Sequence, residues 1–119
     1  MKKMFILLLA LLIVANCQCK ISMFIDDLKS NGYYDLIHQI KCAFGDDVAI
    51  SICRELVQKG NQKDYSLYCE EVIKVYINSC INTKTQISFE DFIRQEENMN
   101  ILLKNLSPNE IEKIIKKNK

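Results

Sequence analysis

Four cysteines in the middle of the chain have a spacing that suits paired, oxidised thiols. Ten residues separate Cys42 from Cys53, fifteen separate Cys53 from Cys69, and ten separate Cys69 from Cys80. Structural zinc sites favour about two to four residues between paired ligands, so this spacing does not fit a metal site. The pattern therefore predicts disulfide bonds, which persist in oxidising compartments.

The geometry of an α-helix restricts which of these bonds can form. Eleven positions along a helix turn through about 1,100° and rise about 16.5 Å, which returns to nearly the same face. Cys69 and Cys80 would therefore share one face about three turns apart, beyond the ~7 Å that the Cα atoms of a disulfide allow. Each of the two must bond to a cysteine on another helix.

In a first alternative, a turn at Gly60-Asn61 folds the flanking helices into an antiparallel hairpin. Cys53 and Cys69 are equally far from position 61, and so are Cys42 and Cys80. Equal distance from the turn places each pair at equal height, which gives nested Cys53–Cys69 and Cys42–Cys80 bonds. We favour this alternative, in which the two remaining cysteines are removed with an N-terminal leader.

In a second alternative, all six cysteines stay in the finished protein. A break in the helix at Gly45-Asp46 lets Cys42 bond to Cys53. The two N-terminal cysteines then hold the start of the chain to the fourth helix, Cys17 and Cys19 pairing with Cys80 and Cys69.

The leader itself has the three-part layout of a secretory signal peptide. Lys2 and Lys3 precede ten apolar residues at 5–14, and small or polar residues follow at 15–19. A membrane-spanning helix needs roughly 20 apolar residues, about twice the length of this run. The pattern therefore predicts a cleaved leader rather than an anchor.

We expect residues 1–19 to be the signal peptide, cut after Ala15 or after Cys19. The first site keeps six cysteines and the second leaves four, so both leave an even number of thiols to pair. Residues 20–119 are then long enough for a single domain. We expect this mature chain to be secreted and to have no transmembrane segment.

The mature sequence predicts an all-α fold, a small disulfide-stapled bundle of about five to six helices. Glycines end the first three apolar segments, and Ser88 and Ser107 begin capping patterns for the last two. The expected helices span residues 21–28, 33–44, 46–59, 64–80, 88–106 and 108–115.

The other reactive side chains form no catalytic constellation. His38 is the only histidine, and it lies on the polar side of its predicted helix with no nucleophile motif nearby. We therefore expect it to be a solvated surface residue. The acidic pairs are adjacent in sequence, so their side chains diverge on a helix. We predict no enzyme, no catalytic residue, no metal site and no cofactor.

Tyrosines are the best candidates to line a ligand site, because each combines an apolar ring with a polar hydroxyl. Packing in the core or at its rim is the ordinary alternative for such side chains. The candidate ligand-lining residues are Tyr33, Tyr65, Tyr68 and Tyr76.

Under the second disulfide alternative, the cysteine pattern resembles that of saposin-like proteins. Cys17-Gln18-Cys19 at the start of a helical segment, followed by Cys42 and by Cys53 ten residues later, is similar to the first four cysteines of that family. The resemblance covers roughly residues 16–80 and implies a helical domain that binds lipids or perturbs membranes. The chain departs from the family in having one residue between its first cysteines and ten between its last pair.

The near-zero net charge argues against nucleic acid as a partner. The chain has 16 basic and 15 acidic residues, and removal of Lys2 and Lys3 leaves 14 − 15 = −1. A near-neutral protein has no general attraction to nucleic acid. Our first hypothesis is a secreted, non-enzymatic binding protein that holds a lipid or another apolar small ligand between its helices. The alternative is a secreted effector, toxin or signalling ligand that docks a protein receptor.

Overall fold

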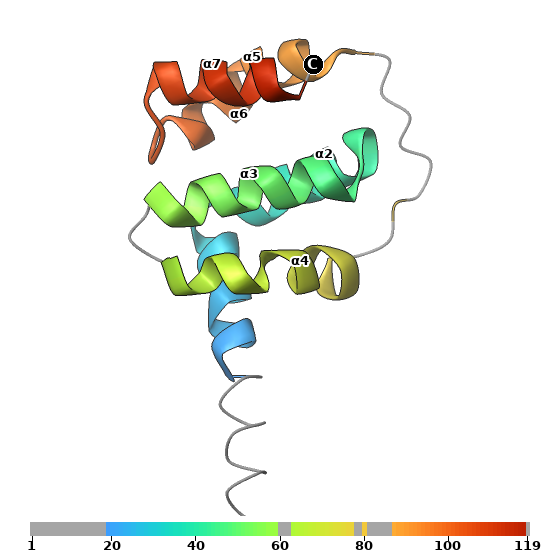
Figure 1. Ribbon diagram of the computed structural model, residues 1–119, viewed down its shortest axis with the longest axis vertical. Coiled ribbons are helices and arrows are strands. Elements are labelled where there is room, and N and C mark those ends of the chain that lie inside the picture. The colour runs from blue at the N-terminus through green and yellow to red at the C-terminus, as the bar shows by residue number, and fades with distance from the viewer. Residues whose placement is uncertain (1–18, 60–62, 78–79, 81–86, 119) are drawn as a thin grey trace, which may run out of the picture.

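The computed structural model describes residues 19–59, 63–77, 80 and 87–118, and all regular secondary structure within these residues is helical. Three layers are stacked, with α2 and α3 in the middle, the short helices around α4 below them, and α5, α6 and α7 above (Figure 1). One cluster of buried apolar side chains runs through all three layers. The predicted all-α, disulfide-stapled bundle is confirmed.

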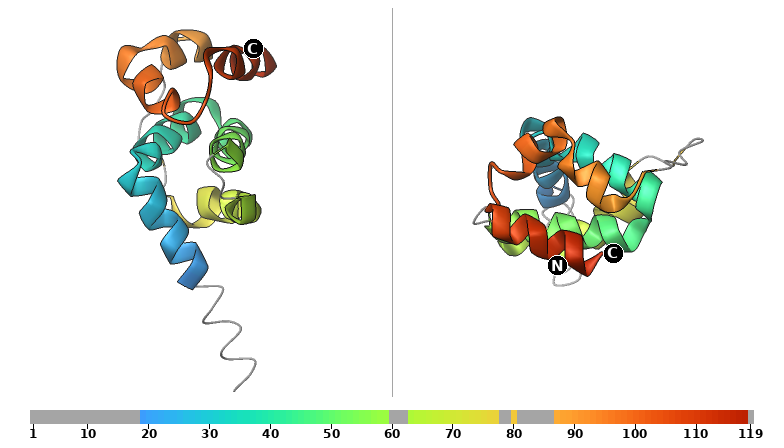
Figure 2. Two further views of the ribbon diagram at one scale, coloured as in Figure 1. Left: turned by 90° about the vertical axis from the view of Figure 1, so that its left-hand side faces the viewer. Right: turned by 90° about the horizontal axis from the view of Figure 1, so that it is seen from above.

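An N-terminal helix is described over residues 19–30 and crosses the two lower layers at a steep angle (Figure 2). Its apolar face buries Ile21, Phe24 and Leu28 in the core. Gly32 follows in a left-handed conformation with a φ of +78°, which glycine adopts without steric cost. This glycine therefore ends the first helix before Tyr33, as predicted.

The middle layer consists of α2 (Tyr33–Phe44) and α3 (Asp46–Lys59). Gly45 separates them with a φ of +102°, so the two helices fold back and pack side by side. Each helix buries one apolar stripe, including Leu36, Ile37 and Ile40 on α2.

The lower layer differs from the single α-helix predicted for residues 64–80. It begins as a 3₁₀ helix, η1 (Lys63–Tyr68), continues as one turn of α-helix, α4 (Cys69–Glu71), and ends as a π-helix, η2 (Val72–Tyr76). The N–H of Ile77 donates to the carbonyl of Val72, five residues earlier. The β-branched residues of this stretch crowd the turn before them and weaken a regular α-helix.

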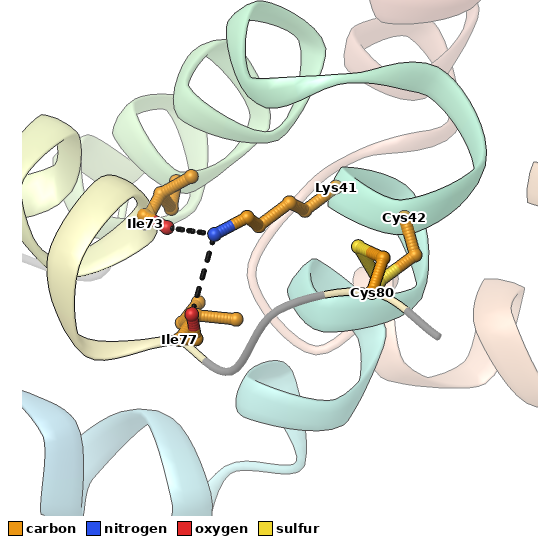
Figure 3. Close-up of a disulfide and its surroundings, with 5 residues drawn as sticks. All are labelled: Lys41, Cys42, Ile73, Ile77 and Cys80. Carbon is orange, nitrogen blue, oxygen red and sulfur yellow. Dashed lines mark hydrogen bonds between the residues drawn. A yellow bond between two sulfur atoms is a disulfide. The ribbon is translucent and has the colours of Figure 1, made fainter. Parts of the chain in front are cut away.

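Lys41 secures the widened end of this segment (Figure 3). Its Nζ donates to the carbonyl oxygen of Ile73 at 2.6 Å and to that of Ile77 at 3.2 Å. These are the carbonyls left at the C-terminal end of η2, where positive charge is favourable. Lys41, although it belongs to α2, therefore caps the C-terminal end of η2. It lies next to the Cys42–Cys80 disulfide.

We predict that Lys41→Met, which keeps the length of the side chain, lowers the free energy of unfolding by about 1.5–3 kcal/mol, because two carbonyls lose a charged donor. Urea unfolding followed by far-ultraviolet circular dichroism measures the change. Lys104→Met is the matched control, because Lys104 is exposed in the turn after α6. Equal stability of the two variants would contradict the role of Lys41.

The upper layer, called the C-terminal layer below, comprises α5 (Phe89–Arg94), α6 (Glu96–Leu102) and α7 (Pro108–Lys117). The single helix predicted over residues 88–106 is wrong, because Gln95 has an extended ψ of 136° that separates α5 from α6. The buried side chain of Asn98 stabilises this break by donating to the carbonyl of Phe92 at 2.7 Å.

The predicted helix starts in this layer are correct. The hydroxyl of Ser88 accepts from the N–H of Asp91. Ser107 and Glu110 form a complete capping box, with Pro108 in the first turn. In the described part of the chain, no helix has the length and apolar character needed to cross a membrane.

Candidate functional site

Two disulfide bonds connect the middle layer to the lower one. Cys42 is bonded to Cys80 with a Cα–Cα distance of 5.2 Å, and Cys53 is bonded to Cys69 with a Cα–Cα distance of 6.0 Å. This is the nested arrangement of the first alternative. Both cysteines of the inner bond are fully buried, whereas Cys80 of the outer bond is exposed.

The second disulfide alternative is wrong, because Cys42 does not bond to Cys53 and neither Cys69 nor Cys80 is free to hold the N-terminus. Cys19 is exposed and has no disulfide bond, and Cys17 lies outside the described residues together with the rest of the predicted leader up to residue 18. The resemblance to saposin-like proteins stays a prediction.

The nested pairing holds even though the chain does not run straight from Cys42 to Cys53. The lower segment runs back along α3, so Cys69 comes to lie beside Cys53. The far end of this lower segment lies near the turn at Gly45, where α2 is joined to α3. Cys42 lies three residues before this glycine, so the fold at Gly45 keeps it within reach of Cys80.

The four candidate tyrosines do not converge on one cavity. Tyr33 is buried at the start of α2, and Tyr65 stacks on Phe24 with ring centroids 4.9 Å apart. Tyr68 is half-buried against the core, and 42% of Tyr76 is exposed on the lower layer. Tyr33 lines a hollow that Tyr65, Tyr68 and Tyr76 do not line.

The hollow beside Tyr33 is small and partly open, with a volume of about 220 Å³. Asn105 of the C-terminal layer also lines it. Burial raises the pKa of the Tyr33 hydroxyl, and the nearby Asn105 side chain opposes the rise. The hydroxyl is thus protonated at neutral pH, and the small hollow beside it has more polar than apolar character.

His38 is not the solvated residue that the sequence predicts. Its side chain is half-buried on α2, and its Nε2 atom is shielded from solvent without a hydrogen-bond partner. Among the described residues, no three histidine, cysteine, aspartate or glutamate side chains gather where they could hold a metal ion.

A hollow with a volume of about 570 Å³ lies on the outer face of α3, beside the end of α7. A second hollow of about 190 Å³ adjoins it and shares three of its lining residues, Ser51, Glu55 and Lys117. Together they form one open depression between α3 and α7, which we call the α3–α7 groove. Figures 1 and 2 show α7 lying over the middle layer along α3.

The groove has an acidic and a basic side. Asp47 and Glu55 line it from α3, and Lys113 and Lys117 line it from α7. Within the part of the chain that the structure describes, these four side chains make no ion pair. The other charges around it are paired, since Glu70 contacts Arg54 at 3.7 Å and Lys74 at 2.9 Å.

One ion pair spans the groove near its smaller hollow. Lys59 Nζ at the end of α3 lies 2.9 Å from Glu110 Oε2 at the start of α7. The Lys59 ammonium and the backbone N–H of Ser107 lower the pKa of Glu110 to about 2. Glu110 thus serves both the cap of α7 and the contact between the two layers.

This shift predicts a pH dependence of stability. The pKa of Glu110 falls from 4.5 to about 2 on folding, so its stabilisation is complete above pH 4.5 and is lost as the pH falls toward 2. We expect the wild-type chain to melt at a higher temperature than Glu110→Gln at pH 6, and the two melting curves to converge near pH 2. Glu71→Gln, at an exposed position on α4, should show no such pH-dependent difference.

Sequence reasoning missed this groove. The spacing of residues within α3 and within α7 contains no signal that the two helices pack together. Comparison with known proteins gives no match, since no family model, no curated protein and no solved structure is similar to this chain.

Proposed function

We propose that this chain is a secreted, non-enzymatic binding protein that docks a protein partner along the α3–α7 groove. One observation carries the proposal: the hollow of about 570 Å³ on α3 is open, and charged side chains form much of its lining. Sites for apolar small molecules are instead concave and mostly apolar. The geometry therefore favours the receptor-docking alternative over a ligand held between the helices.

The groove offers the elements that protein interfaces use. Val48 and Ile50 provide apolar surface at its base, and charged side chains surround them. A protein interface typically has an apolar centre and a polar rim, and complementary charges fix the orientation of the partner. Its two sides, Asp47 with Glu55 and Lys113 with Lys117, favour a partner that presents both signs of charge.

Secretion is supported by two separate features. The leader pattern at residues 1–19 predicts export, and two disulfide bonds suit an oxidising compartment. N-terminal sequencing of the exported protein identifies the cut site and tests this part of the proposal.

Titration of the fluorescently labelled secreted chain onto cultured cells tests docking. We expect saturable binding that becomes about tenfold weaker in the double variant Lys113→Glu/Lys117→Glu. Lys20→Glu/Lys104→Glu makes the same change in net charge at exposed positions outside the groove and should bind like the wild type. Equal loss in both double variants, or no saturable binding on any cell type, would refute docking through the groove.

Contact with a lipid surface is the second candidate, and exposed apolar side chains on the lower part of the molecule favour it. Leu67 is 81% exposed, Val75 is 69% exposed and Met23 is 54% exposed. Exposed apolar side chains mark an interaction site where they form a contiguous patch. Sedimentation with vesicles of phosphatidylcholine and phosphatidylserine tests it, and Leu67→Ser/Val75→Ser should abolish any binding by this route.

A further inference from the structure

The two sides of the α3–α7 groove are attached to the molecule in different ways. Helix α3 belongs to the lower two layers, which both disulfide bonds connect. Helix α7 belongs to the C-terminal layer, and residues 87–118 contain no cysteine. The basic side of the groove is therefore held in place by non-covalent contacts alone.

The C-terminal layer is tied together internally. Arg94 of α5 contacts Glu90 on its own helix at 3.1 Å and Glu112 on α7 at 2.8 Å. Asn98 of α6 binds the last turn of α5 through the carbonyl of Phe92. These contacts join all three helices of the layer into one unit.

Contacts between this layer and the middle layer are both apolar and polar. The Phe44 ring of α2 packs edge-on against Phe89 and Phe92, with ring centroids 5.2 and 5.5 Å apart. The buried apolar side chains of α5, α6 and α7 belong to the same cluster as those of α2 and α3. At the groove, Lys59 of α3 meets Glu110 of α7 in an ion pair, which is a specific contact in addition to this burial.

We propose that the C-terminal layer docks and undocks as a unit, and that the Lys59–Glu110 ion pair holds the groove end of the layer in place. The groove exists only in the docked state, because its acidic side is on α3 and its basic side is on α7. A partner that touches both sides therefore binds only the docked state and shifts the population toward it. The shift of population by a partner rests on the proposed function, whereas the docking and undocking of the C-terminal layer do not.

Hydrogen–deuterium exchange of the full chain, followed by mass spectrometry, tests the docking. In the wild type, amides of α5 and α7 should exchange faster than those of α3, since a sub-global opening needs less free energy than global unfolding. Lys59→Met and Glu110→Gln should each raise exchange across α5 and α7 by about 1.5-fold to 5-fold and leave α3 unchanged. Glutamine at 110 keeps the capping-box contact, so this variant removes the ion pair alone.

The double variant Lys59→Met/Glu110→Gln should raise exchange across α5 and α7 by no more than the larger of the two single variants does, because both substitutions remove the same contact. Lys104→Met, at an exposed lysine of the same layer that makes none of the described ion pairs, should exchange like the wild type. Three results would each overturn the proposal: equal exchange of α3 and α7 in the wild type, variants that accelerate all helices alike, or variants with no effect. Failure to bind cells would instead refute the proposed function and leave the exchange result intact.

Discussion

The double variant Cys53→Ala/Cys69→Ala is expected to lose about 3 kcal/mol or more of its free energy of unfolding. The bond closes a loop of 16 residues, and the entropy that such a loop removes from the unfolded chain corresponds to about 3 kcal/mol. Both cysteines are fully buried, so each alanine also leaves a small cavity in the core. A domain of this size has only about 5–15 kcal/mol in total.

Cys42→Ala/Cys80→Ala is the matched comparison. Its sequence separation of 38 residues is larger, but the inner bond already shortens this loop while it remains intact. Cys80 is exposed, so its replacement leaves no enclosed cavity. Urea unfolding should give a lower free energy of unfolding for the Cys53→Ala/Cys69→Ala variant than for the Cys42→Ala/Cys80→Ala variant. The reverse order would contradict this account of the core.

Phe24→Ala is expected to cost about 3–5 kcal/mol, because it removes a fully buried ring from the N-terminal helix. This ring stacks on Tyr65 at 4.9 Å and so joins the N-terminal helix to the lower layer. The adjacent Met23 provides the control, since 54% of its surface is exposed and Met23→Ala should change stability by only about 0.5 kcal/mol.

Thermal unfolding measured by calorimetry distinguishes the two variants. A large loss for Phe24→Ala alone would establish the N-terminal helix as part of the core. Similar small losses of stability for both variants would mean that the fold holds without this helix. The stably folded part of the chain would then begin at Tyr33.

The parts of the fold that the sequence predicts are those set by local backbone chemistry. Gly32 and Gly45 both adopt a positive φ, and the helices end at these residues as expected. Ser88 and Ser107 accept hydrogen bonds from the N–H groups that their positions predict. The two disulfide pairs are those of the favoured alternative, although the straight run from Cys42 to Cys53 that it assumes is broken at Gly45.

Features that depend on contacts between distant segments could not be predicted. The π-helix at Val72–Tyr76 is stabilised by Lys41, which comes from another helix 32 residues earlier. The break at Gln95 depends on a buried asparagine that an amphipathic pattern treats as surface. The α3–α7 groove arises where α7 lies along α3 (Figures 1 and 2), and no spacing within either helix indicates that contact.

The unequal burial of the two disulfide bonds has a consequence for the order of oxidative folding. Thiol–disulfide exchange needs an attacking thiolate to reach the sulfur, and no reagent reaches Cys53 or Cys69 once the layers are packed. The inner bond must therefore form before the helices close over it, in a loosely collapsed chain. The outer bond, with Cys80 at the surface, can form last and can be reduced first by a mild thiol while the folded molecule stays intact.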